Sequence, residues 1–199
     1  MKLYALSVLY KTGDNKATRL ISAHELSSFG YFQKSSVKEF MNFSSKIIVE
    51  RTLASSRSSV KEQEYICHVY VNSNNVGAVL IADHEYPQRV AHTLLNKVIE
   101  EFEKKIDKKY WSISKEDEIR LPEVELLLTK YQNPKEADAM TKINADLDET
   151  KIILHNTIEA VLQRGEKIDD LVEKSEGLSL QSKTFYKTAR KTNSCCVIL

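Results

Sequence analysis

The chain has 199 residues, of which 42% are hydrophobic and 29% charged, and its formal net charge is +1. This length fits one ordinary domain plus an appendage or two small domains, and the near-neutral charge excludes an overall attraction to nucleic acid. The apolar run at residues 79–82 is extended only by Ala78, and no uninterrupted apolar stretch is longer, whereas a membrane-spanning helix needs about 20 such residues. The first residues show no signal-peptide pattern. We therefore expect a protein made in the cytosol, with reduced cysteines.

Residues 1–131 have the mixed pattern of an α+β domain. Short β-branched and aromatic runs indicate strands, and turn residues such as those at positions 13–15 and 72–75 separate them into hairpins. Ser36 and Glu39 have the spacing of a helix capping box, and Pro87 opens a long amphipathic pattern. The predicted strands are residues 2–10, 18–21, 65–71 and 76–82, and the predicted helices are residues 36–48, 87–106 and 124–131. This order predicts an antiparallel sheet between helices.

The pattern changes after Asn133-Pro134. From residue 140 to residue 192 there is no proline, and apolar residues recur at alternating intervals of three and four. We expect residues 132–139 to be a linker and residues 140–192 to be a helical coiled-coil segment, which would extend about 80 Å if it were continuous. Besides Arg164, the seam positions are Met140, Ile143, Leu147, Thr150, Leu154, Thr157, Val161, Ile168, Leu171, Ser175, Leu178, Ser182, Phe185, Ala189 and Thr192.

Arg164 is the most informative of these residues. An arginine on a helix is most often a solvated surface residue, but Arg164 occupies the seam in register with its neighbours. A buried, unpaired guanidinium would be strongly destabilising, so its N–H donors require acceptors on neighbouring helices, and neutral glutamine carbonyls would serve. Gly165, Gly177 and the polar seam positions weaken a lone helix. We expect the segment to be partly disordered or docked on the folded domain until it enters a multi-helix bundle.

The last residues, 193–199, form a lipidation signal. Cys196 heads a C-a-a-X box, which directs prenylation of that thiol, and Leu199 favours geranylgeranyl over farnesyl. One lipid gives only marginal membrane binding, so Cys195 is the expected second site, through reversible palmitoylation. Nearby cations add weak electrostatic attraction to a membrane; they are Lys183, Lys187, Arg190 and Lys191.

These residues carry a family resemblance. The run Glu149-Thr150-Lys151, together with residues 161–171 (VLQRGEKIDDL), resembles the core of an R-SNARE motif, and Arg164 falls at the position of that family's ionic-layer arginine. Residues 36–52 and 76–102 resemble a longin domain, a profilin-like regulatory fold. With its C-terminal cysteines, the whole chain resembles the YKT family of prenylated longin-type synaptobrevin homologues. The resemblance implies an antiparallel five-stranded sheet between helices, followed by a SNARE helix, and it also suggests a second prenyl group at Cys195.

The same resemblance implies function and partners. An R-SNARE on the vesicle side would join three glutamine-bearing SNARE (Q-SNARE) helices to fuse membranes in ER–Golgi, endosomal or vacuolar and autophagic traffic, and disassembly machinery would recycle it. Such a protein would have a cytosolic pool and a pool on the cytoplasmic face of Golgi, endosomal and vesicle membranes. The longin domain would shelter the lipid and dock the SNARE segment, and the family places this regulatory surface at Phe40 and Phe43. Taken singly, Phe40 reads as core, whereas Phe43 lies off the Phe40–Ile47 line and reads as surface.

The sequence offers no catalytic or cofactor site. The five histidines lack metal-ligand spacing, and no phosphate-binding loop is present. Cys67 and His68 are adjacent, so on a strand they point to opposite faces and cannot form a nucleophile–base pair. We expect no enzyme activity and no cofactor other than covalent lipids. The alternative function is a prenylated coiled-coil signalling adaptor without fusion activity.

Overall fold

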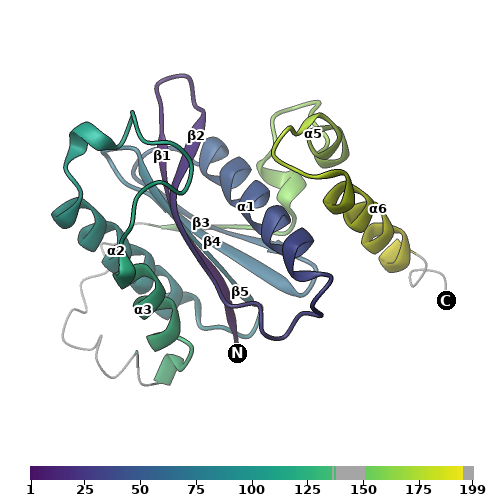
Figure 1. Ribbon diagram of the computed structural model, residues 1–199, viewed down its shortest axis with the longest axis horizontal. Coiled ribbons are helices and arrows are strands. Elements are labelled where there is room, and N and C mark those ends of the chain that lie inside the picture. Colours follow the sequence, from purple (N-terminus) through teal and green to yellow (C-terminus); the bar gives the residue numbers. More distant parts are fainter. Residues whose placement is uncertain (136, 138–150, 195–199) are drawn as a thin grey trace.

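The computed structural model describes residues 1–135, 137 and 151–194, with side chains up to Arg190 in the last helix (Figure 1). A six-stranded sheet, in the order β2-β1-β5-β4-β3-β6, lies between two groups of helices. The strands are β1 (Leu3–Lys11), β2 (Ala17–His24), β3 (Ser56–Glu62), β4 (Tyr65–Val71), β5 (Val76–Asp83) and β6 (Ile152–His155). The α-helices are α1 (Lys34–Arg51), α2 (Gln88–Lys105), α3 (Pro122–Lys130), α5 (Ile168–Lys174) and α6 (Leu180–Ser194), and the 3-10 helices are η1 (Lys108–Tyr110) and η2 (Ile158–Val161).

The five strands of the N-terminal domain are antiparallel, as the expected fold requires. The β1–β2 and β4–β5 hairpins turn at Asn15 and Asn75, which take the left-handed conformation at φ 62° and 61°. β6 is the difference from the five-stranded expectation, because the C-terminal segment adds this strand parallel to β3. The α+β prediction is therefore confirmed, with one strand more than expected.

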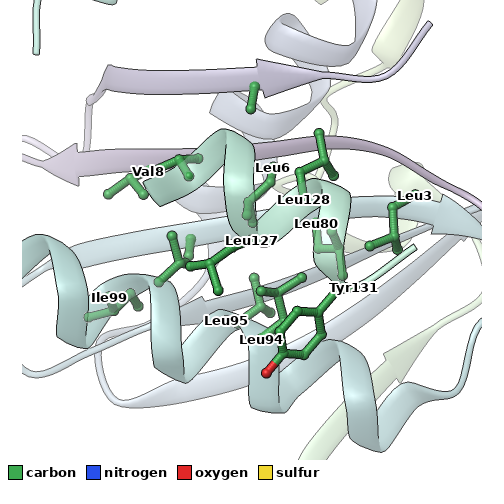
Figure 2. Packing of buried hydrophobic residues seen from close by; sticks show 14 of the residues in the cluster. Leu3, Leu6, Val8, Leu80, Leu94, Leu95, Ile99, Leu127, Leu128 and Tyr131 are labelled. Carbon is green, nitrogen blue, oxygen red and sulfur yellow. The ribbon is translucent and has the colours of Figure 1, made fainter. Parts of the chain in front are cut away.

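Two hydrophobic cores lie on opposite faces of the sheet. On one face, leucines of β1, β5, α2 and α3 pack together, including the fully buried Leu6, Leu80 and Leu94 (Figure 2). Burial of each such side chain stabilises the fold by about 1.5–3 kcal/mol. The other core lies under α1 and contains Val49, Val69 and residues of the C-terminal segment. The α1 face is therefore the one on which the two parts of the chain meet.

The capping box predicted at the start of α1 is not formed. The helix begins earlier, with Gln33 at the N-cap position, and Ser36 is a buried residue of its first turns. The carboxylate of Glu39 instead accepts a hydrogen bond from the backbone N–H of Ser179 at 2.8 Å. Glu39 therefore binds the C-terminal segment to α1 and does not cap the helix.

In the single chain, the described part of the SNARE-like segment is not the continuous helix that we expect it to form in a multi-helix bundle. Residues 140–150 lie outside the described part, and residues 152–194 are divided among β6, η2, α5 and α6. Gly165 has φ +90° in the turn before α5, and Gly177 lies in the connection to α6. Without partner helices the apolar stripe has no coiled coil to enter, so it packs on α1 and the sheet instead. Within the described residues, no helix combines the length and apolar character needed to cross a membrane.

Candidate functional site: the docking surface for the C-terminal segment

The C-terminal segment, residues 151–194, first docks through its backbone. β6 pairs in parallel with β3, in a register from Arg57 opposite Ile152 to Val60 opposite His155. Beyond the strand, the backbone N–H of Ile158 donates to the carboxylate of Glu62 at 3.1 Å. This pairing covers the edge of β3, whose backbone groups would otherwise lack partners.

Apolar side chains of the segment then complete the core under α1. Ile168, Val172 and Leu178 are 4%, 0% and 5% exposed, and they join a cluster that includes Val37 and Met41 of α1. Burial of three such side chains contributes roughly 5–9 kcal/mol as an upper bound, before the cost of ordering the segment. This contact forms an apolar part of the docking surface.

An aromatic contact continues the surface along α6. The ring of Tyr186 stacks on Phe40, with centroids 5.1 Å apart and an interplanar angle of 21°, and Phe43 lies 6.0 Å from Phe40. Burial raises the pKa of Tyr186 to about 12, and its hydroxyl donates to Asp169 at 2.9 Å. Phe40 and Phe43 are both half-buried, so neither is simply core or simply surface. Their regulatory role stays a prediction.

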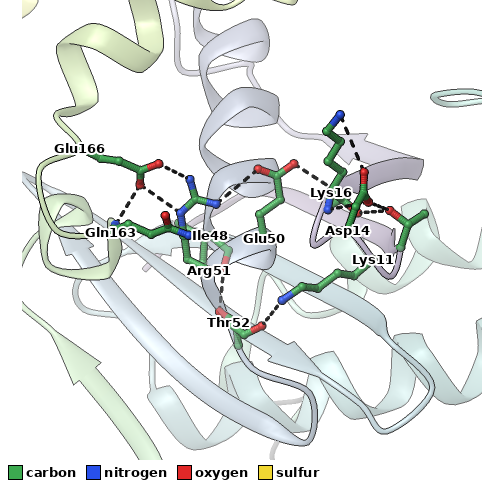
Figure 3. Close-up of polar contacts among 11 residues, drawn as sticks. Lys11, Asp14, Lys16, Ile48, Glu50, Arg51, Thr52, Gln163 and Glu166 are labelled. Carbon is green, nitrogen blue, oxygen red and sulfur yellow. Dashed lines mark hydrogen bonds and ion pairs between the residues drawn. The ribbon is translucent and has the colours of Figure 1, made fainter.

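A charged pair fastens the turn between η2 and α5. Arg51, in the last turn of α1, donates to Glu166 from Nη2 at 2.7 Å and from Nε at 3.2 Å (Figure 3). The same carboxylate accepts the backbone N–H of Gln163 at 2.8 Å. The Gln163 hydrogen bond, and then Arg51, hold the pKa of Glu166 below its ordinary value.

Arg164 lies in this same turn, with its side chain exposed to solvent. Among the residues that the structure describes, no acceptor contacts its guanidinium. The arginine that is expected to sit at the centre of a multi-helix bundle is thus accessible while flanking residues hold the turn in place.

The seam residues divide by exposure. Ile168, Leu178 and Ser182 are buried; Val161, Leu171, Ser175, Phe185 and Ala189 are half-buried; Leu154, Thr157 and Arg164 are exposed. Thr192 lies in the last turns of α6. Met140, Ile143, Leu147, Thr150, Cys195 and Cys196 are outside the described residues. The docking surface therefore covers mainly the C-terminal half of the seam, and the roles predicted for these residues remain predictions.

Sequence reasoning missed three parts of this surface. Val172, Tyr186 and Glu166 lie off the seam, so the heptad pattern gave no reason to select them. The aromatic residues of α1 could have indicated this surface, because an apolar helix face requires another element to cover it.

A second polar cluster is internal and lies on the opposite face of the sheet. Ser59 Oγ is 2.8 Å from His68 Nδ1 and 3.2 Å from His92 Nε2, and all three side chains are fully buried. Burial lowers the pKa of His68 to about 4 and that of His92 to about 3. Cys67 belongs to the α1-side core, so the prediction that Cys67 and His68 face opposite ways is confirmed.

Comparisons with known proteins agree with this division of the chain. The longin family model, described as a regulated-SNARE-like domain, matches residues 26–125, and the synaptobrevin family model matches residues 139–197. The chain is 48% identical over 201 residues to a synaptobrevin homolog YKT6 of Eremothecium gossypii, and 47% identical over 201 residues to that of Saccharomyces cerevisiae. It is 48% identical over 199 residues to the homolog of Schizosaccharomyces pombe. Each of these comparisons covers 100% of both chains.

Proposed function

Because the chain belongs to the YKT6 family of longin-type synaptobrevin homologues, which are R-SNAREs of vesicle traffic, we propose that it drives membrane fusion by assembling with three glutamine-bearing SNARE helices. Residues 140–192 would supply the fourth helix, and Arg164 would meet glutamine carbonyls at its centre. The family is a non-enzymatic class, and the proposed action is mechanical.

The second part of the proposal is autoinhibition, and it rests on the burial of two seam residues. Ile168 and Leu178 would face partner helices in the bundle, yet they are buried against the N-terminal domain. One apolar stripe cannot pack on α1 and on three helices at the same time. Docking therefore competes with assembly, and the longin domain holds the SNARE segment inactive until partners displace it.

Undocking also requires a change of secondary structure. Leu154, a seam residue, lies in β6, and Val161 lies in η2. Both segments would have to become α-helical to enter a bundle. Helix formation without partners is unfavourable because nucleation is costly and the segment contains two glycines. This supports a closed resting chain.

We further propose that the closed chain shelters its lipid. Cys196 would carry a geranylgeranyl or farnesyl group, and Cys195 a palmitoyl or second prenyl group. A groove of about 530 Å³ lies between the start of α1 and α6, with Phe32, Leu180 and Phe185 in its lining. An apolar groove beside the helix that precedes the cysteines supports this role. A sheltered lipid would permit a cytosolic pool, and an exposed one would bring the chain to Golgi, endosomal and vesicle membranes, from which disassembly machinery would recycle it.

Assembly assays test the proposal. The purified chain, mixed with candidate glutamine-bearing SNARE helices, should form a heat-resistant four-helix complex. An Arg164→Ala variant should form a complex that is less stable or out of register. Lys174→Ala is the matched control, because it removes an exposed positive charge at a position off the seam. Failure of the native chain with every helix set, even after release of the longin domain, would refute the proposal and favour the adaptor alternative.

A further inference from the structure

The basic residues that precede the C-terminal cysteines contact the rest of the segment. Lys187 Nζ is 2.8 Å from Glu173 Oε2, and Lys183 Nζ donates to the backbone carbonyl of Glu173 at 2.7 Å. Arg190 contacts the carboxylate of Asp169 and lies 3.3 Å from that of Glu159. The hydroxyl of Tyr186 accepts from Arg190 at 2.8 Å while it donates to Asp169. The positive face of α6 is thus turned toward carboxylates of η2 and α5.

These contacts depend on the break between α5 and α6. Lys183, Lys187 and Arg190 are spaced by four and three residues, so they share one face of α6. In one continuous helix, Glu173 and Lys187 would be about 21 Å apart, and Asp169 and Arg190 about 32 Å apart. Both distances exceed the screening length of about 8 Å at physiological salt. Straightening the segment therefore breaks every contact that these cations make with η2 and α5.

No new partner within the helix would replace them. Glu176 is the last acidic residue of the chain, and residues 177–199 contain four cations and no carboxylate side chain. The cations also lie off the seam positions Ser182, Phe185 and Ala189, so a four-helix bundle would leave them on its outside. They would then form a basic stripe directly beside the two lipid-bearing cysteines.

We propose that this stripe is a binding site for the head groups of an anionic membrane, and that its members Lys183, Lys187 and Arg190 are masked in the closed chain and exposed when the segment straightens. The inference rests on the proposed undocking. The pairs that mask the stripe are exposed ion pairs, and each is individually weak. They therefore neutralise the charge of the stripe but add little to the stability of the closed chain. Masking and opening are also coupled reciprocally: an anionic surface that binds the stripe favours the open chain by the same factor.

Vesicle binding by a Cys195→Ser/Cys196→Ser chain tests the site without a lipid anchor. A further Val172→Asn change opens the segment, because Val172 is fully buried on the docking surface and is not a seam residue. Each basic residue near an anionic surface strengthens binding about fivefold. We expect the opened chain to bind phosphatidylserine-containing vesicles at least about tenfold more tightly than the closed chain, with no gain on pure phosphatidylcholine. Adding Lys187→Gln and Arg190→Gln should remove most of the gain.

A second experiment removes the acidic partners of the stripe without opening the chain. Asp169→Asn/Glu173→Gln should raise binding to the anionic vesicles while the protease-resistant closed form persists. The inference is overturned if the protease-sensitive Val172→Asn chain binds these vesicles no better than its parent, or if the gain survives Lys187→Gln/Arg190→Gln. If Val172→Asn accelerates SNARE assembly but leaves vesicle binding unchanged, this inference fails and the proposed function stands. If Val172→Asn changes neither opening nor assembly, the docking account itself fails.

Discussion

Arg51 of α1 pairs with Glu166, two residues beyond the seam arginine, and this pair fixes the turn in which Arg164 faces solvent. The pair joins the end of α1 to the middle of the C-terminal segment. Glu166 lies off the seam, so the contact belongs to the closed chain alone and can be altered without touching the assembly surface.

Glu166→Gln should therefore loosen the closed chain selectively. The pair is partly exposed, so its loss costs about 0.5–1 kcal/mol and shifts the opening equilibrium about two- to fivefold. Hydrogen exchange of the η2 and α5 amides should quicken by that factor. Glu176→Gln is the control, since it removes the same charge at an exposed position of the α5–α6 connection. Equal exchange in the two variants would show that the pair does not hold the turn.

Phe40→Ala should weaken the docking of α6. The stacked pair with Tyr186 contributes about 1 kcal/mol beyond its buried area, so we expect opening to rise at least about fivefold. Hydrogen exchange across α6 would measure this change. The matched control is Tyr31→Ala, because Tyr31 is an aromatic residue that is 84% exposed and lies just before α1. A Phe40→Ala chain with unchanged α6 exchange would contradict the assignment of Phe40 to the docking surface.

The buried histidines predict a pH dependence of stability. The pKa values of His68 and His92 are about 4 and about 3 in the folded chain, below the ordinary value of 6.5, because burial disfavours the charged form. The unfolded chain then binds more protons below pH 6.5. Their contribution to stability is complete above pH 6.5 and declines as the pH falls toward about 4, by up to about 1.4 kcal/mol per pH unit for each histidine.

Denaturant unfolding at pH 7 and pH 5 measures this decline. His92→Gln keeps a group that can donate to Ser59 but does not titrate, so it should lose less stability between the two pH values than the native chain. His24, whose pKa is also lowered by burial to about 4, and the carboxylates titrate in both proteins and cancel from the comparison. His84→Gln is the control at an exposed site. The same decline in all three proteins would contradict the role of the His92 side chain.

The sequence was sufficient for the β1–β2 and β4–β5 hairpins, the long helix after Pro87 and the family, because each depends on local periodicity or a contiguous motif. It did not reveal β3, since Ser56, Arg57, Ser58 and Ser59 look like a polar loop. These residues are buried or nearly so, and their edge is covered by β6, which is encoded about 95 residues later in the chain. Pairing between strands that lie so far apart in the chain leaves no pattern in the local sequence.

The heptad pattern predicts the helix of a multi-helix complex, and it does not say how the single chain arranges the same residues. The positions of Ile168, Leu178 and Ser182 fit a seam, and the same side chains fit the face of α1. The surface on which they pack depends on whether partner helices are present, and this cannot be read from the sequence of one chain. Ser36 and Glu39 show the same limit at smaller scale, because a capping motif was replaced by the contact between Glu39 and Ser179.

The central claim is that docking and SNARE assembly compete for one surface, and the rate of assembly tests it most directly. We would compare the native chain with Val172→Asn, mixed with the same three glutamine-bearing helices, and follow complex formation over time. Because Val172 is off the seam, the account predicts faster assembly and a final complex of unchanged stability. Equal rates, in a variant shown by proteolysis to be open, would mean that the closed arrangement does not restrain assembly.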